Sequence, residues 1–239
     1  MSMWVASHTG LPSFHVKGSW QVVGVLDGVE RLVAAGSGAA VFSDAAAPVN
    51  EPVEYVVTDS SGTSRGQLTR AGSHARFITD MWGRSVVPII WQGDDALSVA
   101  QSAEVFTTSG SNFPIVRFNK PAITTGAITL RTSLDGTPTL SRLVRSDSPL
   151  WLVHDRTACQ IPGCDVDPVR LIAITSETSY KRTARPDTAE RVWQFTYHLL
   201  NPASHSKAPT VTYREARQAD FKFGSGSYLD AAKKIARMP

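Results

Sequence analysis

The sequence is poor in charge and has no long apolar run. Charged residues make up 19% of its 239 residues, and the net charge is only +3. Lysine and arginine do not gather into a basic stripe, which argues against nucleic-acid binding. No segment approaches the roughly 18 consecutive apolar residues of a membrane-spanning helix, and residues 1–10 lack the pattern of a signal peptide. We therefore expect a protein made in the cytoplasm that neither binds nucleic acid nor inserts into a membrane.

The motifs of common enzymes are missing as well. There is no Gly-x-Ser-x-Gly nucleophile turn, no His-Glu-x-x-His metal motif and no phosphate-binding loop, since residues 224–227 lack the lysine of such a loop. His154 and Asp155 could form half of an acid–base pair, but the only candidate nucleophile, Cys159, has no evident base. We therefore predict that the protein is not an enzyme and has no catalytic residue and no cofactor.

Cysteine is scarce: Cys159 and Cys164 are the only two in the chain. With His154 they could hold a metal, but zinc takes four ligands and this histidine adds only a third. They could instead lie at the tip of a hairpin, as free thiols or as a disulfide formed under oxidising conditions. The sequence leaves these two states open and predicts no metal site.

Two further binding sites can be considered. The acidic pairs Asp94–Asp95 and Asp165–Asp167 could ligate calcium, but such a site needs six or more oxygens and acidic turns are commoner. Trp82, Trp91 and Trp151 could form a platform for stacking sugars. All three lie in or beside apolar stretches, and tryptophans in β-proteins are usually buried.

The clearest structural pattern lies in residues 191–199. Trp193, Phe195, Tyr197 and Leu199 fall on one face of a strict two-residue alternation, which predicts a half-buried antiparallel strand over residues 191–199. Pro202 ends it, because proline cannot donate to a strand ladder. We predict that Trp193, Phe195 and Tyr197 are buried and that this strand closes an all-β core.

The 42% hydrophobic content is sufficient for such cores. Residues 1–75 are predicted to form a small fibronectin type III-like β-sandwich. Strands are expected at 20–26 and 29–34, around the hairpin turn Asp27-Gly28, and at 39–43 and 53–58.

Residues 76–202 are predicted to form a second β-sandwich or split barrel with one helix. The helix is expected from Thr137, as N-cap, through Pro138 to Arg145, with Leu140, Leu143 and Val144 as its apolar stripe. The strands are expected at 85–90, 99–107, 115–118, 127–131, 150–154, 171–178 and 191–199.

Residues 203–239 are predicted to form a C-terminal arm with short helices. The segment Thr212-Tyr-Arg-Glu-Ala recurs fifteen residues later as Ser227-Tyr-Leu-Asp-Ala. Each copy starts with a capping hydroxyl and carries a carboxylate three residues on, as in a helix capping box.

The order of these parts resembles the minor tail proteins of long-tailed phages that infect actinobacteria, a group related to distal tail proteins. The resemblance is carried by residues 47–58 (the end of a fibronectin-like module), 77–80 and 85–89 (a linker), 125–132 (a strand before the helix), 149–152 and 191–202 (closing strands) and the paired tail segments. It extends over nearly the whole chain.

The resemblance implies a structural role at the tail tip of the virion. Such a protein would form a ring, most commonly a hexamer, and would join the tail-tube protein to other tail-tip or baseplate hub proteins. The second domain would share the fold of tail-tube subunits. The alternative function is a receptor- or carbohydrate-binding module on the same tail tip.

Truncation after Ser204 tests the arm. Its few large apolar side chains cannot offset an ordering cost of about 1–2 kcal/mol per residue without a partner surface. We expect the truncated chain to keep both β domains folded, measured by thermal unfolding, and to assemble into tail tips less efficiently. If the truncated and full-length chains assemble equally well, the arm has no part in assembly.

Overall fold

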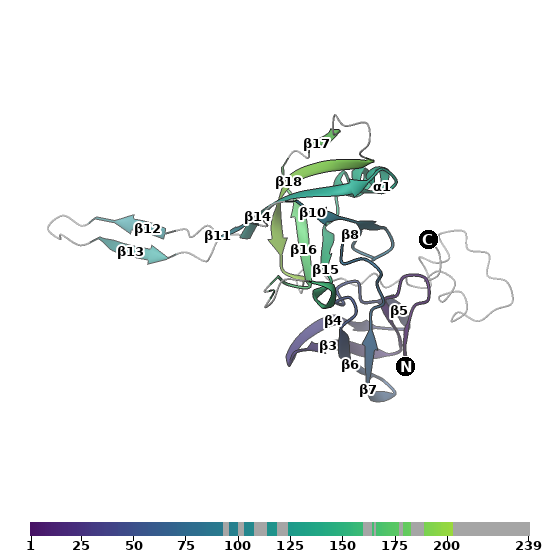
Figure 1. The fold of residues 1–239 in the computed structure, drawn as a ribbon. Coiled ribbons are helices and arrows are strands. Elements are labelled where there is room, and N and C mark those ends of the chain that lie inside the picture. Colours follow the sequence, from purple (N-terminus) through teal and green to yellow (C-terminus); the bar gives the residue numbers. More distant parts are fainter. Residues whose placement is uncertain are drawn as a thin grey trace.

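The computed structural model describes residues 1–92, 96–99, 103–107, 114–118, 124–159, 164, 166–176, 179–182 and 189–202. The described part is mainly β, with one α-helix, as predicted. It comprises an N-terminal sandwich and a larger second sheet, stacked one on the other (Figure 1). The predicted C-terminal arm lies outside the described residues.

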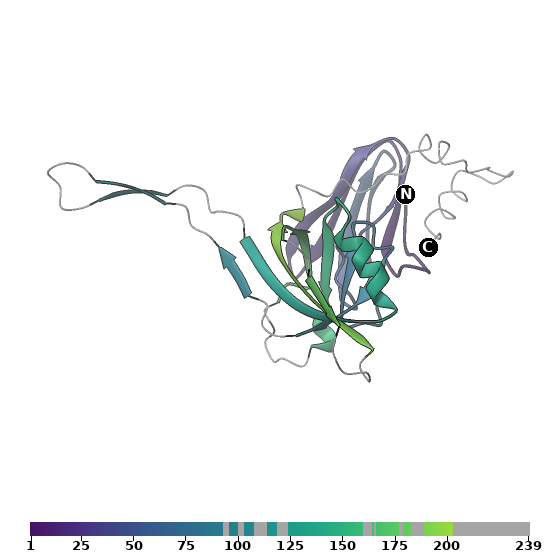
Figure 2. The ribbon, with the colours of Figure 1, turned by 90° about the horizontal axis from the view of Figure 1, so that it is seen from above.

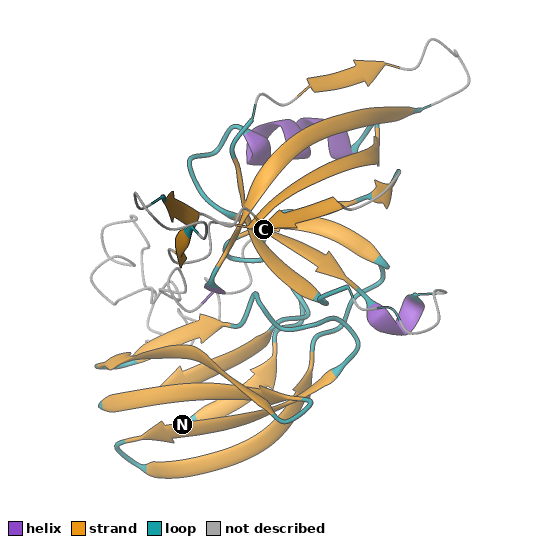
Figure 3. Ribbon diagram, turned by 90° about the vertical axis from the view of Figure 1, so that its left-hand side faces the viewer, coloured by secondary structure: helices purple, strands orange, loops and turns teal. Residues whose placement is uncertain are grey.

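The N-terminal part is a sandwich of two antiparallel sheets (Figure 3). One sheet has the order β1-β2-β5 (Ser2–Val5, Pro12–Val16 and Ala40–Ser43), and the other has the order β4-β3-β6-β7 (Val29–Ser37, Ser19–Leu26, Pro52–Asp59 and Gly62–Thr69). Inward residues of both sheets form one apolar core, which includes Phe14, Trp20 and Tyr55. This arrangement agrees with the predicted fibronectin type III-like module.

The predicted turn between β3 and β4 is confirmed. Asp27 and Gly28 both have positive φ, 51° and 77°. A two-residue turn needs such angles to match the right-handed twist of the strands that it joins. The polar strand β7 and the short strands β1 and β2 were not predicted, because their sequences lack a long alternation of apolar residues.

The second sheet has nine strands. Its main path is β10-β14-β18-β16-β15-β8-β9 (Ile90–Trp91, Thr124–Ser133, Glu190–Leu200, Val169–Ile174, Leu150–His154, Arg76–Asp80 and Val86–Pro88). β9 pairs with β8, while β10, which follows after Ile89 alone, pairs with β14. This bent segment joins the two ends of the path, so the sheet closes into a barrel.

One sequence prediction in this region needs correction, and two others gain detail. Residues 77–80, predicted as a linker, form most of β8, whose buried side chains include Phe77 and Ile78. Of the strand predicted over 99–107, Val99 ends β11 (Ala96–Val99) and residues 103–106 form β12 (Ala103–Phe106), while residues 100–102 lie outside the described residues. β18 is the last strand of the barrel in sequence, but it lies inside the sheet between β14 and β16.

Beyond the barrel, β12 and β13 (Ile115–Phe118) pair only with each other among the described strands. They form a hairpin that projects far from the rest of the molecule (Figure 2). β11 connects this hairpin to the barrel by pairing with the start of β14. β17 (Ser179–Arg182) pairs antiparallel with residues 191–194 of β18.

The barrel core is built on β18, and the predicted burial of its aromatic face is confirmed. Trp193, Phe195 and Tyr197 are all at most 2% exposed and belong to one cluster with Leu140 and Leu143 of the helix. The Trp193 indole also donates a hydrogen bond of 3.0 Å to the Thr132 hydroxyl.

The helix α1 runs from Gly136 to Val144, close to the predicted range. Thr137 is not its N-cap: Asp135 holds that position without a side-chain bond. Instead, Ser133 Oγ accepts a hydrogen bond from the Gly136 amide, and the Thr137 hydroxyl donates to the Ser133 carbonyl. The preceding strand thus supplies the cap. Within the described residues, no helix is long and apolar enough to cross a membrane.

Replacing Trp193 tests the central role of β18. Trp193→Ala removes a buried ring and leaves a cavity, so we expect a loss of about 3–5 kcal/mol in the free energy of unfolding, measured by chemical denaturation. Gln194→Ala, on the exposed face of the same strand, should change stability by no more than about 0.5 kcal/mol. Similar losses for both variants would contradict the assignment.

Candidate functional site

The sandwich and the barrel meet at a joint formed by residues 44–51 of the sandwich and the outer face of β8, β15 and β16. Its apolar part contains Ala45, Val49, Phe77, Trp151, Val153 and Leu171, all buried. Beside it, Asn50 Nδ2 donates to Asp155 Oδ2 at 2.8 Å. Arg156 forms ion pairs with Glu51 and, at 3.1 Å, with Asp27. The segment that follows β15 is therefore held by the sandwich.

Buried charges fix residues 44–51 from inside. Asp44 is 3% exposed and accepts hydrogen bonds from Tyr55 at 2.9 Å and from Arg31 at 2.5 Å. Arg70 donates to the carbonyls of Ala45 and Ala47, both at 3.0 Å. Burial lowers the pKa of Arg70 to about 10, although Asp44 and Tyr55 oppose this shift. The satisfied charges hold the loop in the one shape that fits the barrel.

A small pocket of about 160 Å³ opens at the joint. Its lining is mostly apolar and includes Leu26, Trp151, Pro168 and Pro202, with Arg31 as its charged member.

The segment after β15 also carries the most chemically distinctive cluster of the described residues. Donor atoms of His154, Cys159 and Cys164 all lie within 4.8 Å of one another. His154 Nε2 is 3.4 Å from Cys164 Sγ. His154 is 1% exposed, and both cysteines are half-buried thiols. The structure thus brings together the three residues that the sequence suggested, and no fourth His, Cys, Asp or Glu of the described chain joins them.

Trp91 and Arg76 hold the His154 ring in place, and the sequence did not connect either residue with this cluster. Trp91 stacks on it, with ring centroids 5.5 Å apart. Arg76 Nε donates to Nδ1 at 3.3 Å, and the same guanidinium lies 4.4 Å from the centre of the Trp91 ring. Burial lowers the pKa of His154, and Arg76 lowers it further. Both effects favour the neutral form of the ring.

His154 and Asp155 do not form an acid–base pair. The imidazole faces Arg76 and Cys164, whereas the Asp155 carboxylate accepts from Asn50 and from the Thr157 amide and hydroxyl. Asp155 instead caps the short 3₁₀ helix Arg156–Ala158.

The three tryptophans proposed for sugar stacking lie in different environments. Trp151 is 3% exposed and packs in the joint, where its indole donates to the Met81 carbonyl. Trp91 is half-buried and packs against the barrel core, while Trp82 is 40% exposed. Burial is confirmed for Trp151 and was wrong for Trp82. These positions provide no common stacking platform.

The suggested calcium ligands are only partly described. Asp94, Asp95 and Asp165 lie outside the described residues. Asp167 is exposed, and one of its oxygens lies 3.8 Å from Arg170 Nε.

Two comparisons of the sequence with known proteins find no match. Neither the protein-family models nor the curated protein sequences contain a match to this chain. The functional argument therefore rests on the residues and their geometry.

The joint makes a prediction about pH. Burial by itself raises the pKa of Asp155, but hydrogen bonds from Thr157, Asn50 and Ala158 outweigh it and hold the pKa below its ordinary value. The stabilisation is thus present above the unfolded-state pKa, about 3.9, and is lost as the pH falls through the lower folded-state value. Asp155→Asn should cost about 1–3 kcal/mol at pH 7, and the difference from the unsubstituted protein should shrink below about pH 4.

The measurement is chemical unfolding across this pH range. Asp147→Asn is the matched control, because Asp147 is an exposed aspartate away from the joint. A difference for Asp155→Asn that stays constant from pH 7 to below pH 3 would show that its charge has no part in the joint.

Proposed function

We propose that this chain is a structural subunit of a phage tail tip, a ring-forming minor tail protein of the distal-tail type. It would contact copies of itself, the tail-tube protein and other tail-tip hub proteins in the virion. The resemblance in sequence motivates this role, and the projecting β12–β13 hairpin supports it most directly.

The hairpin exposes apolar side chains on both faces. Phe106 lies opposite Ile115 across the pair, and Val105 lies opposite Val116. All four are exposed, from 42% for Val116 to 61% for Val105. Successive residues of a strand point to opposite faces, so each face carries one apolar pair.

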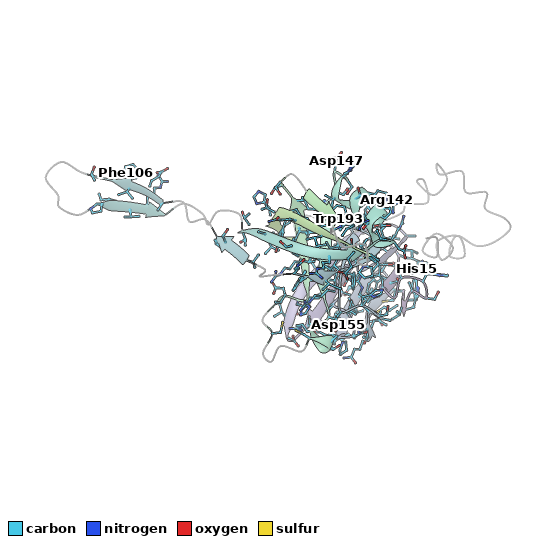
Figure 4. All side chains as sticks on the ribbon, turned by 45° about the horizontal axis from the view of Figure 1, so that its top comes forward. His15, Phe106, Arg142, Asp147, Asp155 and Trp193 are labelled. Carbon is cyan, nitrogen blue, oxygen red and sulfur yellow. The ribbon has the colours of Figure 1, made fainter. Side chains whose placement is uncertain are left out.

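Such a hairpin has little reason to be stable alone. Two strands without a covering layer are at best marginal in water, and each strand also presents an open edge among the described strands. Exposed edges and apolar patches of this kind mark surfaces that bind other chains. Phe106 is far from the body of the molecule, which favours contact with a neighbouring subunit (Figure 4).

A ring of subunits would give the projecting hairpin a surface to pack on. In a ring, the arm of each subunit packs on a different surface of the next one, and the contact repeats until the ring closes. Every hairpin would then be covered on the assembled particle. The alternative carbohydrate-binding role lacks a comparable supporting observation, because the candidate tryptophans lie in different environments.

Polar substitution of one face of the hairpin tests the proposal. Phe106→Ser with Ile115→Ser should leave the unfolding temperature nearly unchanged, because the hairpin lies outside the barrel core. The same variant should lose ring assembly, which light scattering of the purified protein and electron microscopy of assembled tail tips measure.

The control replaces two exposed apolar residues elsewhere, Val29→Ser with Leu134→Ser. It should assemble like the unsubstituted chain. If the hairpin variant also assembles normally, or if the unsubstituted chain forms no ring in tail tips, the proposed role is wrong.

A further inference from the structure

The His154–Cys159–Cys164 cluster has a use that the tail-tip role does not require. The chain's two cysteines lie in the connection between β15 and β16, with their sulfur atoms no more than 4.8 Å apart. Both are half-buried, so small reagents can reach them. Their neighbour His154 is almost fully buried, so its ring is a rigid support for the sulfur atoms.

The protonation of His154 follows from its contacts. The Arg76 guanidinium can only donate hydrogen bonds, and its Nε lies 3.3 Å from Nδ1. Nδ1 must therefore accept, and the single proton of the neutral ring lies on Nε2. That nitrogen faces Cys164 Sγ at 3.4 Å. The N–H group therefore points at the sulfur of Cys164 and holds it in place.

The same contact disfavours a metal ion at this site. A histidine that binds zinc through Nε2 carries its proton on Nδ1 and donates it to an acceptor. Here Nδ1 faces a guanidinium instead. Arg76, Arg170 and Arg156 act on the His154 ring as positive charges, and Asp155 acts in the opposite direction. The Arg76 guanidinium at Nδ1 is the positive charge in direct contact with the ring, and it disfavours a bound cation.

We propose that Cys159 and Cys164 form a redox-active dithiol that reacts with small-molecule disulfides and closes to an intramolecular disulfide. The Cys164 thiolate attacks one sulfur of the small disulfide, forms a mixed disulfide and releases one thiolate. Cys159 then attacks Cys164 Sγ and displaces the second. Two protein thiols are oxidised, one small disulfide is reduced to two thiols, and the two protons pass to the released thiolates.

Closure would affect the joint between the sandwich and the barrel. The 3₁₀ helix Arg156–Ala158 ends next to Cys159 and begins at Asp155, which binds Asn50. Arg156 binds Glu51 and Asp27. A disulfide immediately after this helix would restrain the segment that the sandwich holds. The reaction itself does not depend on the proposed tail-tip role.

The experiment treats the full, reduced chain with oxidised glutathione and follows its intact mass. The expected product has lost two hydrogen atoms, carries no glutathione and no longer reacts with iodoacetamide. Cys159→Ser should stop at a mixed disulfide on Cys164. Cys164→Ser should stop at a mixed disulfide on Cys159, so neither single variant should form the intramolecular disulfide.

Two further variants test the role of His154 as a positioning residue. His154→Phe keeps a ring but removes the donor, so in the Cys159→Ser background it should slow the reaction of Cys164. His154→Gln retains an N–H group and should restore part of the rate. If His154→Phe fails to fold, the products of the two serine variants still test whether the two cysteines close on each other.

Two results would overturn the proposal. One is two separate mixed disulfides on the unsubstituted chain, with no intramolecular disulfide. The other is one equivalent of zinc in the purified chain that is absent from both serine variants, since the cluster would then be a metal site. Neither result bears on ring assembly, so this inference and the proposed function fail independently.

Discussion

The second domain depends on one strand, β18. It forms ladders with β14 on one side and with β16 and β17 on the other, and its aromatic side chains fill the barrel. Tyr197 needs space across the sheet, where its partner is Gly126. A Cβ at that glycine would lie 2.2 Å from the tyrosine ring, so the glycine is required by the packing of the aromatic core.

The barrel closes and the sandwich docks on it because some barrel strands bury both of their faces, one in the barrel core and one in the joint. In β15, Leu150 and Leu152 face the barrel core, while Trp151 and Val153 face the joint. A strand buried on both sides has no alternating pattern, and all its residues are indeed buried. The buried charges around Asp44 and Arg70 then give the sandwich loop one arrangement on that surface, because buried charges must keep their partners.

The joint and the hairpin suit different tasks. The joint has a buried apolar cluster beside paired polar groups, and it fixes the segment that carries the two cysteines. The hairpin is uncovered and remote, so its apolar side chains are available to another chain. The proposed tail-tip role would use both properties: a rigid body that sets the position of the arm, and an arm whose stability is completed by a neighbour.

The sequence by itself determined the local features. The alternation at Trp193, Phe195 and Tyr197 predicted a half-buried strand, and Asp27-Gly28 predicted the hairpin, because both depend on neighbouring residues. The tertiary structure decided what depends on distant ones. The bend at Ile89 closes the barrel by pairing with two separate strands, which no local pattern indicates. The proton position on His154 is set by Arg76, 78 residues away in the chain, so the character of the cysteine cluster appears only in the folded molecule.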